Sequence, residues 1–243
     1  MKLIVHGATG RMGQLLCQLA EQQGHTIAAR VAVDAPEALG YYRSLADCSA
    51  AADCVVDFSN HAATAELLAF CTAGKLPVVI ATTGQTEAEK AAITASAADI
   101  PVFISANMSI GVAVLAGLAQ RAAAAFPTAD IEIVEIHHNQ KLDVPSGTAL
   151  LLARAVQSVR PGSTLLIGRH ENGKRTAQEI GVHSIRLGNE VGTHEILIST
   201  GNEVVTLKHE AKSRALFADG ALAAAAWLLG KPAGLYGMQD MMV

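Results

Sequence analysis

The chain has 243 residues, a length that fits one or two domains. Apolar residues make up 51% of it and charged residues 16%, a composition that excludes a disordered or coiled-coil protein. The formal net charge is −4 and no basic block occurs, so we expect no nucleic-acid partner.

The cysteines and the apolar segments bear on the compartment. The four cysteines are Cys17, Cys48, Cys54 and Cys71, and no CxxC pair occurs among them. We therefore expect reduced thiols, with neither a zinc site nor a disulfide framework. The apolar run before Arg11 is too short for a signal peptide. Polar residues interrupt the uncharged segment 100–120, and this pattern favours a strand, a turn and a helix over a membrane span. These features predict a cytoplasmic protein with no membrane association.

The first hundred residues alternate short apolar runs with longer helical patterns. Strands are expected over 2–6, 26–33, 54–57, 77–81 and 101–105. Helices are expected over 11–23, 61–73 and 86–97. Strands that are apolar along their whole length and joined through helices predict a parallel sheet covered on both faces. This α/β pattern is typical of a doubly wound, Rossmann-like dinucleotide-binding domain.

After residue 105 the pattern changes. A helix is expected over 110–125, followed by a strand over 130–136 in which polar and apolar residues alternate. The remaining elements are a helix over 148–159, strands over 182–186, 195–199 and 203–210, and an Ala-rich helix over 215–229. This part therefore predicts an α+β domain with an antiparallel or mixed sheet, and its last helix is expected to pack on the first domain.

A glycine motif follows the first expected strand and opens a helix. Gly7, Gly10 and Gly13 form a GxxGxxG pattern, one residue longer than the common GxGxxG. Glycine allows a tight turn and close approach to a pyrophosphate, while the helix start offers N–H groups. The position favours dinucleotide binding, with a structural turn as the alternative. About 20 positions further on, Asp34 is either the ribose-binding acid at the end of the second strand, which favours NAD over NADP, or a solvated turn residue.

A second motif occupies residues 135–149, which read EIHHNQKLDVPSGTA. A serine or threonine at a helix start is usually a helix cap, and two adjacent histidines are usually surface residues. Against these structural explanations, this short segment concentrates two imidazoles, an ammonium group and two hydroxyls. A histidine that titrates near neutrality can act as a general acid, and Lys141 with the amides of Gly147 and Thr148 can bind carboxylates. No metal is expected, because His137 and His138 would point to opposite faces of a strand.

This segment resembles the signature of the 4-hydroxy-tetrahydrodipicolinate reductase family, ExHHxxKxDxPSGTA, and matches it throughout. Other segments also resemble that family, namely 7–13, 57–59, 81–84, 105–108 and 213–214, in the same order along essentially the whole chain. The resemblance implies NAD(P)H-dependent reduction of 4-hydroxy-tetrahydrodipicolinate to tetrahydrodipicolinate in lysine and diaminopimelate biosynthesis. It also implies hinges near Asn107 and Ser213-Arg214, and a homotetramer assembled through the substrate-domain sheets.

The resemblance also implies two domains and a role for each matched residue. Residues 1–107 and 214–243 would bind the dinucleotide, and residues 108–213 would bind the small cyclic dicarboxylate substrate and mediate oligomerisation. The expected cofactor-binding residues are Gly7, Ala8, Thr9, Gly10, Arg11, Met12, Asp34, Ala81, Thr82, Thr83, Ser105, Ala106, Asn107 and Met108. His137 would be the proton donor or acceptor, and Lys141 would be a second proton donor. His138, Ser146, Gly147 and Thr148 would form the substrate-binding group.

Two departures from the family pattern concern the cofactor domain. Ala81 stands where many members have glycine, and the usual cofactor-selecting acid would fall at Ala32, whereas the nearby acid is Asp34. The choice between NADH and NADPH therefore stays open, with Arg11 and Arg30 as the nearest cations for a 2′-phosphate. The alternative functions are another dehydrogenase of the same domain plan and a nucleotide-sensing module without turnover, neither of which requires the 135–149 cluster.

Overall fold

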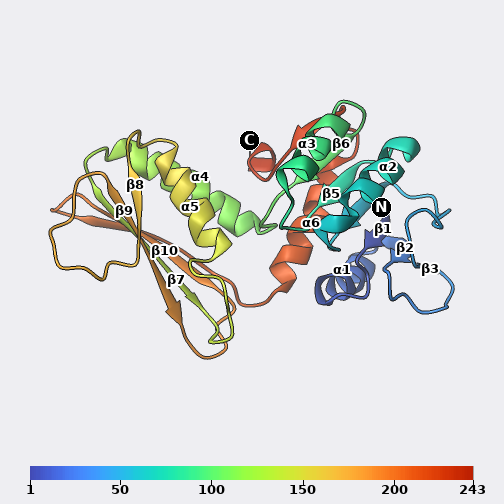
Figure 1. Ribbon diagram of the computed structural model, residues 1–243, viewed down its shortest axis with the longest axis horizontal. Coiled ribbons are helices and arrows are strands. Elements are labelled where there is room, and N and C mark those ends of the chain that lie inside the picture. The colour runs from blue at the N-terminus through green and yellow to red at the C-terminus, as the bar shows by residue number, and fades with distance from the viewer. Residues whose placement is uncertain (243) are drawn as a thin grey trace. The chain divides into compact units, whose positions relative to one another are not determined.

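The structure is a computed structural model that describes residues 1–242. The chain divides into two compact units (Figure 1). One comprises Met1–Ser109 together with the chain from Ala215 onward, and the other comprises Ile110–Arg214. The breaks between the units fall beside the segments for which the family resemblance implies hinges.

The first unit is built on a seven-stranded sheet in the order β12-β6-β5-β4-β1-β2-β3. Its strands are β1 (Lys2–His6), β2 (Thr26–Val31), β3 (Tyr41–Tyr42), β4 (Cys54–Asp57), β5 (Val78–Ile80), β6 (Pro101–Ile104) and β12 (Gly234–Tyr236). Every pairing is parallel. The strand order is that of a Rossmann fold with one strand added at the edge, so the parallel Rossmann-like sheet is confirmed.

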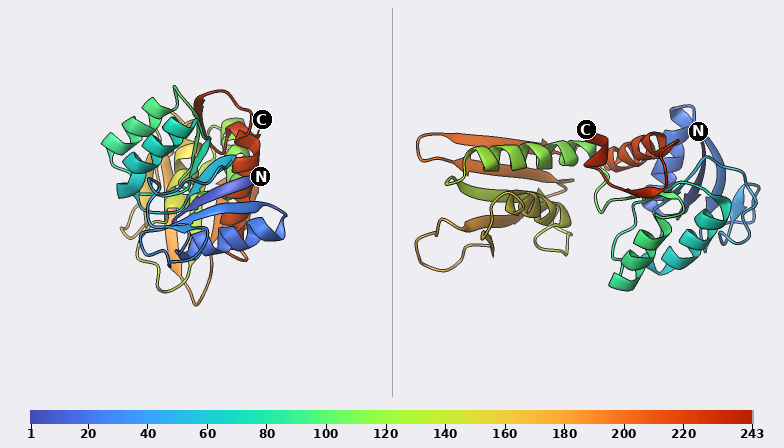
Figure 2. Two further views of the ribbon diagram at one scale, coloured as in Figure 1. Left: turned by 90° about the vertical axis from the view of Figure 1, so that its right-hand side faces the viewer. Right: turned by 90° about the horizontal axis from the view of Figure 1, so that it is seen from above.

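Helices cover both faces of this sheet. They are α1 (Arg11–Gln22), α2 (Thr64–Gly74), α3 (Glu87–Ser96) and α6 (Ala215–Leu228), with short 3₁₀ turns at His61–Ala63 and Asp240–Met242. Figure 2 shows α1 and α6 on one face and α2 and α3 on the other. The strands are buried on both sides, which is why they read as continuous apolar runs. The last helix thus packs on the first unit, as its apolar composition predicts.

The second unit pairs a five-stranded mixed sheet with two helices. Its elements are α4 (Ile110–Ala125), β7 (Asp130–His137), α5 (Gly147–Gln157), β8 (Thr164–Ile167), β9 (Glu179–Arg186), β10 (Thr193–Ser199) and β11 (Val204–Glu210). The sheet order is β11-β10-β7-β9-β8, with β10 antiparallel to both neighbours and β7, β9 and β8 parallel. Ile131, Ile133, Val182 and Ile196 face α4 and α5 in one core. The expected mixed sheet is confirmed.

Several boundaries differ from those expected. The strand expected over 26–33 ends at Val31, because the chain turns at Ala32, whose carbonyl accepts the amide of Ala35 at 2.9 Å. Asp34 therefore lies in an exposed turn beyond β2 and does not itself end the second strand. The helix expected over 61–73 begins as the 3₁₀ turn His61–Ala63 and becomes α-helical from Thr64.

Three strands escaped prediction altogether, for physical reasons. The β3 and β12 strands have two and three residues, too few to show a period. The β8 strand is followed by a loop that contains Gly168 and Gly173, and its four residues show no alternation of burial. These are edge strands of the two sheets.

The described residues also bear on membranes, cysteines and metals. No helix within residues 1–242 has both the length and the hydropathy to cross a membrane. The four cysteines are buried free thiols, and burial raises the pKa of Cys54 to about 12. Over the same residues, no group of three or more His, Cys, Asp or Glu side chains is arranged to hold a metal ion.

Candidate active site

The glycine turn between β1 and α1 has the shape that the sequence predicts. Gly7 adopts φ +80°, and a Cβ placed on it would lie 2.6 Å from the carbonyl oxygen of Phe58. Its amide and that of Ala8 both donate to the carbonyl of Val31, at 2.8 and 3.1 Å. Gly10 is the N-cap of α1 and supplies no side-chain cap. The first-turn amides of α1 therefore face outward from a turn that only glycine can make.

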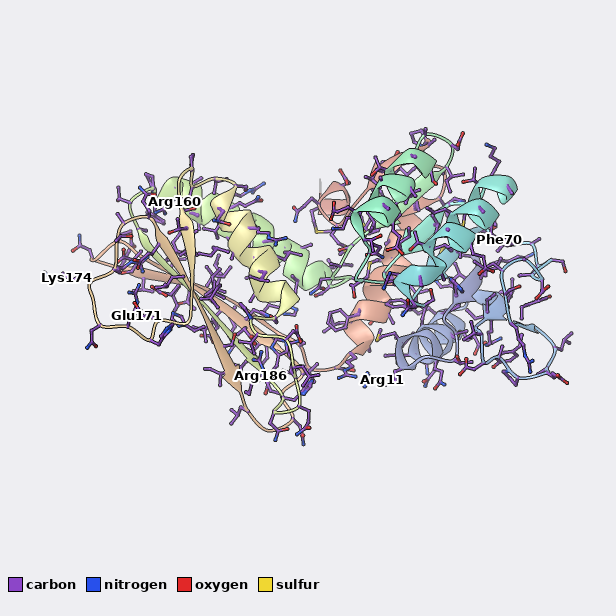
Figure 3. All side chains as sticks on the ribbon, viewed as in Figure 1. Arg11, Phe70, Arg160, Glu171, Lys174 and Arg186 are labelled. Atoms are coloured by element: carbon purple, nitrogen blue, oxygen red, sulfur yellow. The ribbon has the colours of Figure 1, made fainter. Side chains whose placement is uncertain are left out.

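A pocket of about 460 Å³ opens at this turn. Its lining comes from three loops at the carboxyl ends of β1, β4 and β5, where Rossmann folds bind ligands. The lining residues are Gly10, Arg11, Met12, Phe58, Ser59, Asn60, Ala81, Thr82 and Thr83. Arg11, labelled in Figure 3, is exposed at the first position of α1. The Thr82 hydroxyl is buried and has no hydrogen-bond partner among the described residues, which suits a polar group of a bound ligand.

Asp34 and the segment 105–108 lie elsewhere around this edge of the sheet. The Thr9 hydroxyl donates to the Asp34 carboxylate at 2.5 Å, so Asp34 reaches back to the glycine turn. Arg30 is in an ion pair with Glu21. Ser105 follows β6, and its hydroxyl bonds the backbone of Asn107. Within the described chain, Ser105, Ala106, Asn107 and Met108 do not line the 460 Å³ pocket.

A buried polar pair beneath the pocket was missed by the sequence reasoning. His6 Nδ1 lies 3.0 Å from Asp57 Oδ1, and the same carboxylate oxygen accepts the Ser59 hydroxyl at 2.5 Å. His6 and Asp57 are direct neighbours in the parallel pairing of β1 with β4. The pair therefore joins the glycine turn to the Phe58–Asn60 loop that lines the pocket. Its signal in the sequence was a polar residue at the end of each of two apolar strands.

In the second unit, a buried carboxylate lies at the centre of the 135–149 segment. Glu135 has no exposed surface and accepts a hydrogen bond from His137 Nδ1 at 2.5 Å. Arg186 donates to both oxygens of Glu135, at 2.9 and 3.0 Å, and the Ser146 amide donates at 3.1 Å. Burial alone would raise the pKa of Glu135, but the hydrogen bonds from His137 and Arg186 outweigh it and hold that pKa far below its ordinary value. Glu135 is therefore ionised.

The helix start beside this carboxylate is held by Ser146. Its hydroxyl accepts the amide of Ala149 at 3.1 Å, so Ser146 is the N-cap of α5, and it also lies 3.2 Å from Nε2 of His194. Gly147 and Thr148 form the first turn, where the helix dipole favours an anion. The His194 ring packs edge-on to His137, with 5.1 Å between centroids. Burial and the nearby His137 lower the pKa of His194 to about 4, so this ring is neutral at pH 7.

The remaining predicted residues lie in the loop between β7 and α5. Lys141 Nζ is 2.9 Å from Asp143 Oδ1 and its side chain is 21% exposed, so its charge is within reach of a ligand. Burial raises the pKa of Asp143 while the hydrogen bond from Lys141 lowers it, and the net effect is a decrease. His138 is half-buried directly after β7. The structure thus brings His137, Ser146, Gly147 and Thr148 to one end of the sheet, with Lys141 in the adjoining loop.

Arg186, His194 and Gly192 were missed by the sequence reasoning. Arg186, labelled in Figure 3, ends β9 and pairs in register with His137. A Cβ on Gly192 would lie 3.0 Å from His137 Nε2, so a glycine here leaves room around that nitrogen. Arg186 was visible only as a cation at the end of an expected strand, and the strand expected at 195–199 began one residue too late to include His194.

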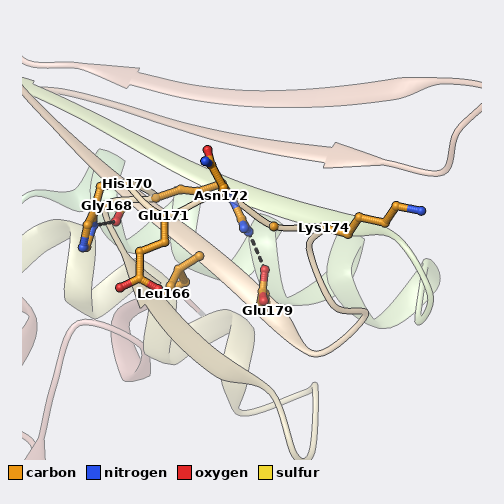
Figure 4. Close-up of a pocket in the computed structure, with 9 residues that line it drawn as sticks. Leu166, Gly168, His170, Glu171, Asn172, Lys174 and Glu179 are labelled. Atoms are coloured by element: carbon orange, nitrogen blue, oxygen red, sulfur yellow. Dashed lines mark hydrogen bonds and ion pairs between the residues drawn. The ribbon is translucent and has the colours of Figure 1, made fainter.

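A second pocket, of about 290 Å³, lies at the loop between β8 and β9 (Figure 4). Arg169 and Lys174 are among its lining residues, and Arg169 is in an ion pair with Glu179. His170 also lines this pocket, and its Nδ1 lies 2.8 Å from the Gly168 carbonyl oxygen. No residue that the sequence singles out lines this pocket.

Comparisons with known proteins agree with the two-part organisation. The family model for the N-terminus of dihydrodipicolinate reductase matches residues 1–108, and that for its C-terminus matches residues 111–242. A 4-hydroxy-tetrahydrodipicolinate reductase of Caldanaerobacter subterraneus subsp. tengcongensis is 41% identical over 100% of this chain and 98% of its own length. Relatives of the same name from Clostridium novyi and Akkermansia muciniphila are each 39% identical, over at least 99% of this chain and 98% of their own length.

Solved structures give the same result. Dipicolinate-bound dihydrodipicolinate reductase from Paenisporosarcina sp. TG-14 matches with a TM-score of 0.84 and 25% identity, over 99% of both chains. An amine dehydrogenase from Mycobacterium smegmatis shares the fold with a TM-score of 0.67 at 10% identity. With both domain models matched in order and full-length relatives near 40% identity, the chain belongs to the dihydrodipicolinate reductase family.

Proposed function

We propose that the protein catalyses the pyridine-nucleotide-dependent reduction of 4-hydroxy-tetrahydrodipicolinate to tetrahydrodipicolinate, a step of lysine and diaminopimelate biosynthesis. The observation that carries the proposal is the buried His137, held by the ionised Glu135 beside the positive end of α5. This places a proton donor next to an anion-binding helix start, as a dicarboxylate substrate requires. The activity is the one named for the relatives that match the whole chain.

The pocket of the first unit fits a dinucleotide. Because Gly7 has no Cβ, the turn can pack against the Phe58 backbone; the first turn of α1 presents amides for a pyrophosphate, and Thr82 offers a buried hydroxyl. The bound nicotinamide cofactor supplies a hydride. The residues proposed to hold it are Gly7, Ala8, Thr9, Gly10, Arg11, Met12, Ala81, Thr82, Thr83, Ser105, Ala106, Asn107 and Met108, with Asp34 at the ribose.

We further propose that NADH is preferred over NADPH. The Asp34 carboxylate lies at the rim of the glycine turn, bonded to Thr9, and it would repel a 2′-phosphate. Arg30, one of the two nearby cations, is neutralised by Glu21. The other, Arg11, lines the pocket at the helix start, where a pyrophosphate would lie.

The second unit supplies binding and protons. His138, Gly147 and Thr148 would hold the substrate carboxylates, while Ser146 fixes the helix start beside them. His137 would donate a proton from Nε2, since Nδ1 is bonded to Glu135. Lys141 would supply a second proton and additional positive charge.

We also propose a cytoplasmic homotetramer. One face of the five-stranded sheet packs against α4 and α5. Because side chains alternate along a strand, Val134, Ile136, Ile185 and Leu197 lie on the opposite face, and Ile185 is 43% exposed. This face also carries the ion pairs Glu132–His183 and Glu195–Lys208, and its apolar side chains suit burial against further copies of the chain.

The experiment that tests the function couples this protein to the preceding synthase. Pyruvate and aspartate semialdehyde supply the substrate in situ, and loss of reduced-nicotinamide absorbance is followed with NADH and, separately, with NADPH. We expect oxidation that depends on the synthase and is faster with NADH. Tight cofactor binding without oxidation would contradict the enzyme assignment and favour a nucleotide-sensing module.

A further inference from the structure

The Glu135 carboxylate is shared between two cationic or protonatable partners. His137 Nδ1 contacts Oε2 at 2.5 Å, and the Arg186 guanidinium contacts both oxygens. Arg186 also donates to the carbonyl of Asp143 at 2.7 Å, which ties it to the loop before α5. Glu135 is fully buried, and the Arg186 side chain is 19% exposed. Water therefore screens this triad only weakly.

Sheet register fixes the arrangement. Glu135 and His137 are two residues apart on β7 and so share the face that packs on α5. The parallel pairing of β7 with β9 places Arg186 directly beside His137. The triad therefore rests on strand geometry and not on a mobile loop.

A carboxylate can only accept hydrogen bonds, so the 2.5 Å contact requires a proton on His137 Nδ1. The neutral ring consequently has its lone pair at Nε2, the nitrogen beside Gly192. Nε2 is then the atom that binds and releases the transferable proton. Glu135 thus selects the tautomer that a general acid at this position requires.

Arg186 determines how strongly the Glu135 carboxylate stabilises the protonated form of His137. A buried glutamate alone beside His137 would stabilise the imidazolium and make it a reluctant donor. Arg186 spreads the carboxylate charge over a bidentate pair and opposes this effect. The other groups near the ring are the neutral His194 on β10 and the Lys141–Asp143 pair in the loop, and His209 on β11 is the cross-strand neighbour of His194.

We propose that Glu135 and Arg186 are positioning residues for the reaction, with Glu135 fixing the tautomer of His137 and Arg186 neutralising Glu135 so that His137 can release its proton. This inference rests on the proposed function for its role in turnover. The effect of Glu135 and Arg186 on the protonation of His137 can be measured on the protein without substrate or cofactor. It assigns to Arg186 a role opposite in sign to that of Glu135.

The test follows the His137 ring by NMR in full-length protein labelled at histidine Cε1, with His137→Gln to assign its signal. Arg186→Gln leaves the carboxylate unopposed, so the titration midpoint of the ring should rise by about one pH unit or more. Glu135→Gln leaves Arg186 unopposed, so the midpoint should fall by a similar amount. The charge-neutral double variant should lie between the two, near wild type.

Arg186→Lys is the control for packing, because it keeps the charge but loses the planar fork. Its midpoint should remain within about 0.3 unit of wild type. If Arg186→Gln does not fold, Arg186→Lys and Glu135→Gln still have different expected results, namely no shift of the midpoint and a fall. The proposal is overturned if Arg186→Gln and Glu135→Gln shift the midpoint in the same direction, or if either of these two variants folds and leaves the midpoint unshifted.

The pH dependence of turnover gives a second readout. The limb of the kcat/KM profile assigned to the general acid should move in the same direction as the ring titration in each variant. Midpoints that move as expected in a protein without synthase-dependent activity would reject the proposed function while the electrostatic assignment stands. If the wild type is active but the titration midpoints of the Arg186→Gln and Glu135→Gln variants do not shift in opposite directions, the electrostatic assignment is rejected while the proposed function stands.

Discussion

The Ser146 hydroxyl lies 3.2 Å from Nε2 of His194 and also accepts the amide of Ala149, so one buried oxygen joins β10 to the start of α5. Ser146→Ala removes both contacts and leaves His194 without this partner. We expect the free energy of unfolding to fall by about 1–3 kcal/mol, measured by urea titration. The KM for substrate should also rise, because the helix start is less well fixed.

Thr86→Ala is the matched control for this change. Thr86 caps α3 in the first unit, where its hydroxyl accepts the amide of Glu89 at 3.2 Å in an exposed capping box. Its loss should cost about 1 kcal/mol and leave the KM for substrate unchanged. Equal effects of the two variants on KM would contradict a special role for Ser146.

The neutral His194 predicts a specific dependence of stability on pH. Burial and His137 lower its pKa from 6.5 to about 4 in the folded protein. Between these values the unfolded chain binds more protons at this residue, so stability is full above about pH 6.5 and declines as the pH falls toward 4. Over the whole window the loss is at most about 3 kcal/mol. Urea unfolding at about pH 7 and pH 5 measures the slope.

His194→Gln should flatten that slope, whereas His170→Gln, at an exposed loop position, should leave it unchanged. Glu135 and Asp143 have lowered pKa values, so their contribution is lost only as the pH falls below their ordinary values of 4.5 and 3.8 and changes little between about pH 7 and pH 5. A His194→Gln variant with the wild-type slope would reject the assignment of a buried neutral ring.

The glycine turn predicts a large effect of one methyl group. Gly7→Ala introduces a Cβ 2.6 Å from the Phe58 carbonyl and strains a backbone at φ +80°. We expect cofactor affinity to fall at least about tenfold, because the turn must shift away from the pyrophosphate position. Isothermal titration with NADH measures the change.

Gly24→Ala separates the two causes. Gly24 has nearly the same φ, +78°, but open space where its Cβ would lie. This variant should lose about 1 kcal/mol of stability and keep its cofactor affinity. A comparable loss of affinity in both variants would show that the close approach at Gly7 is not what shapes the pocket.

Asp34 predicts the cofactor ratio. Asp34→Ala removes the carboxylate bonded to Thr9, and the kcat/KM ratio of NADPH to NADH should rise about tenfold or more. Asp99→Ala, another exposed acid in the first unit, serves as the control and should not change the ratio. An unchanged ratio in Asp34→Ala would place the ribose elsewhere.

Local patterns predicted much of the fold and which polar residues of the candidate site lie close together. The alternation over Asp130–His137 fixed which residues of β7 are buried, and the continuous apolar runs indicated the parallel sheet. The polar residues of the 135–149 segment are close in sequence, so their proximity in space follows from a strand, a turn and a helix start.

Contacts that depend on sheet register could not be predicted in the same way. Arg186 reaches Glu135 across 51 residues, and only the pairing of β7 with β9 brings them together. The His6–Asp57 contact depends likewise on the pairing of β1 with β4. Neither pair leaves a periodic signal, because the two partners of each pair lie on different strands and a pattern within one strand does not show which strand it pairs with.

The most direct test of the account is the synthase-coupled rate of reduced-nicotinamide oxidation in His137→Ala and Lys141→Ala, with Lys174→Ala as a charge-matched control in the exposed loop of the second unit. Loss of a general acid should lower turnover by about 10²- to 10⁴-fold in the His137 and Lys141 variants. The Lys174 variant should retain the wild-type rate. Unchanged turnover in both His137→Ala and Lys141→Ala would contradict the assignment of the 135–149 segment as the proton source.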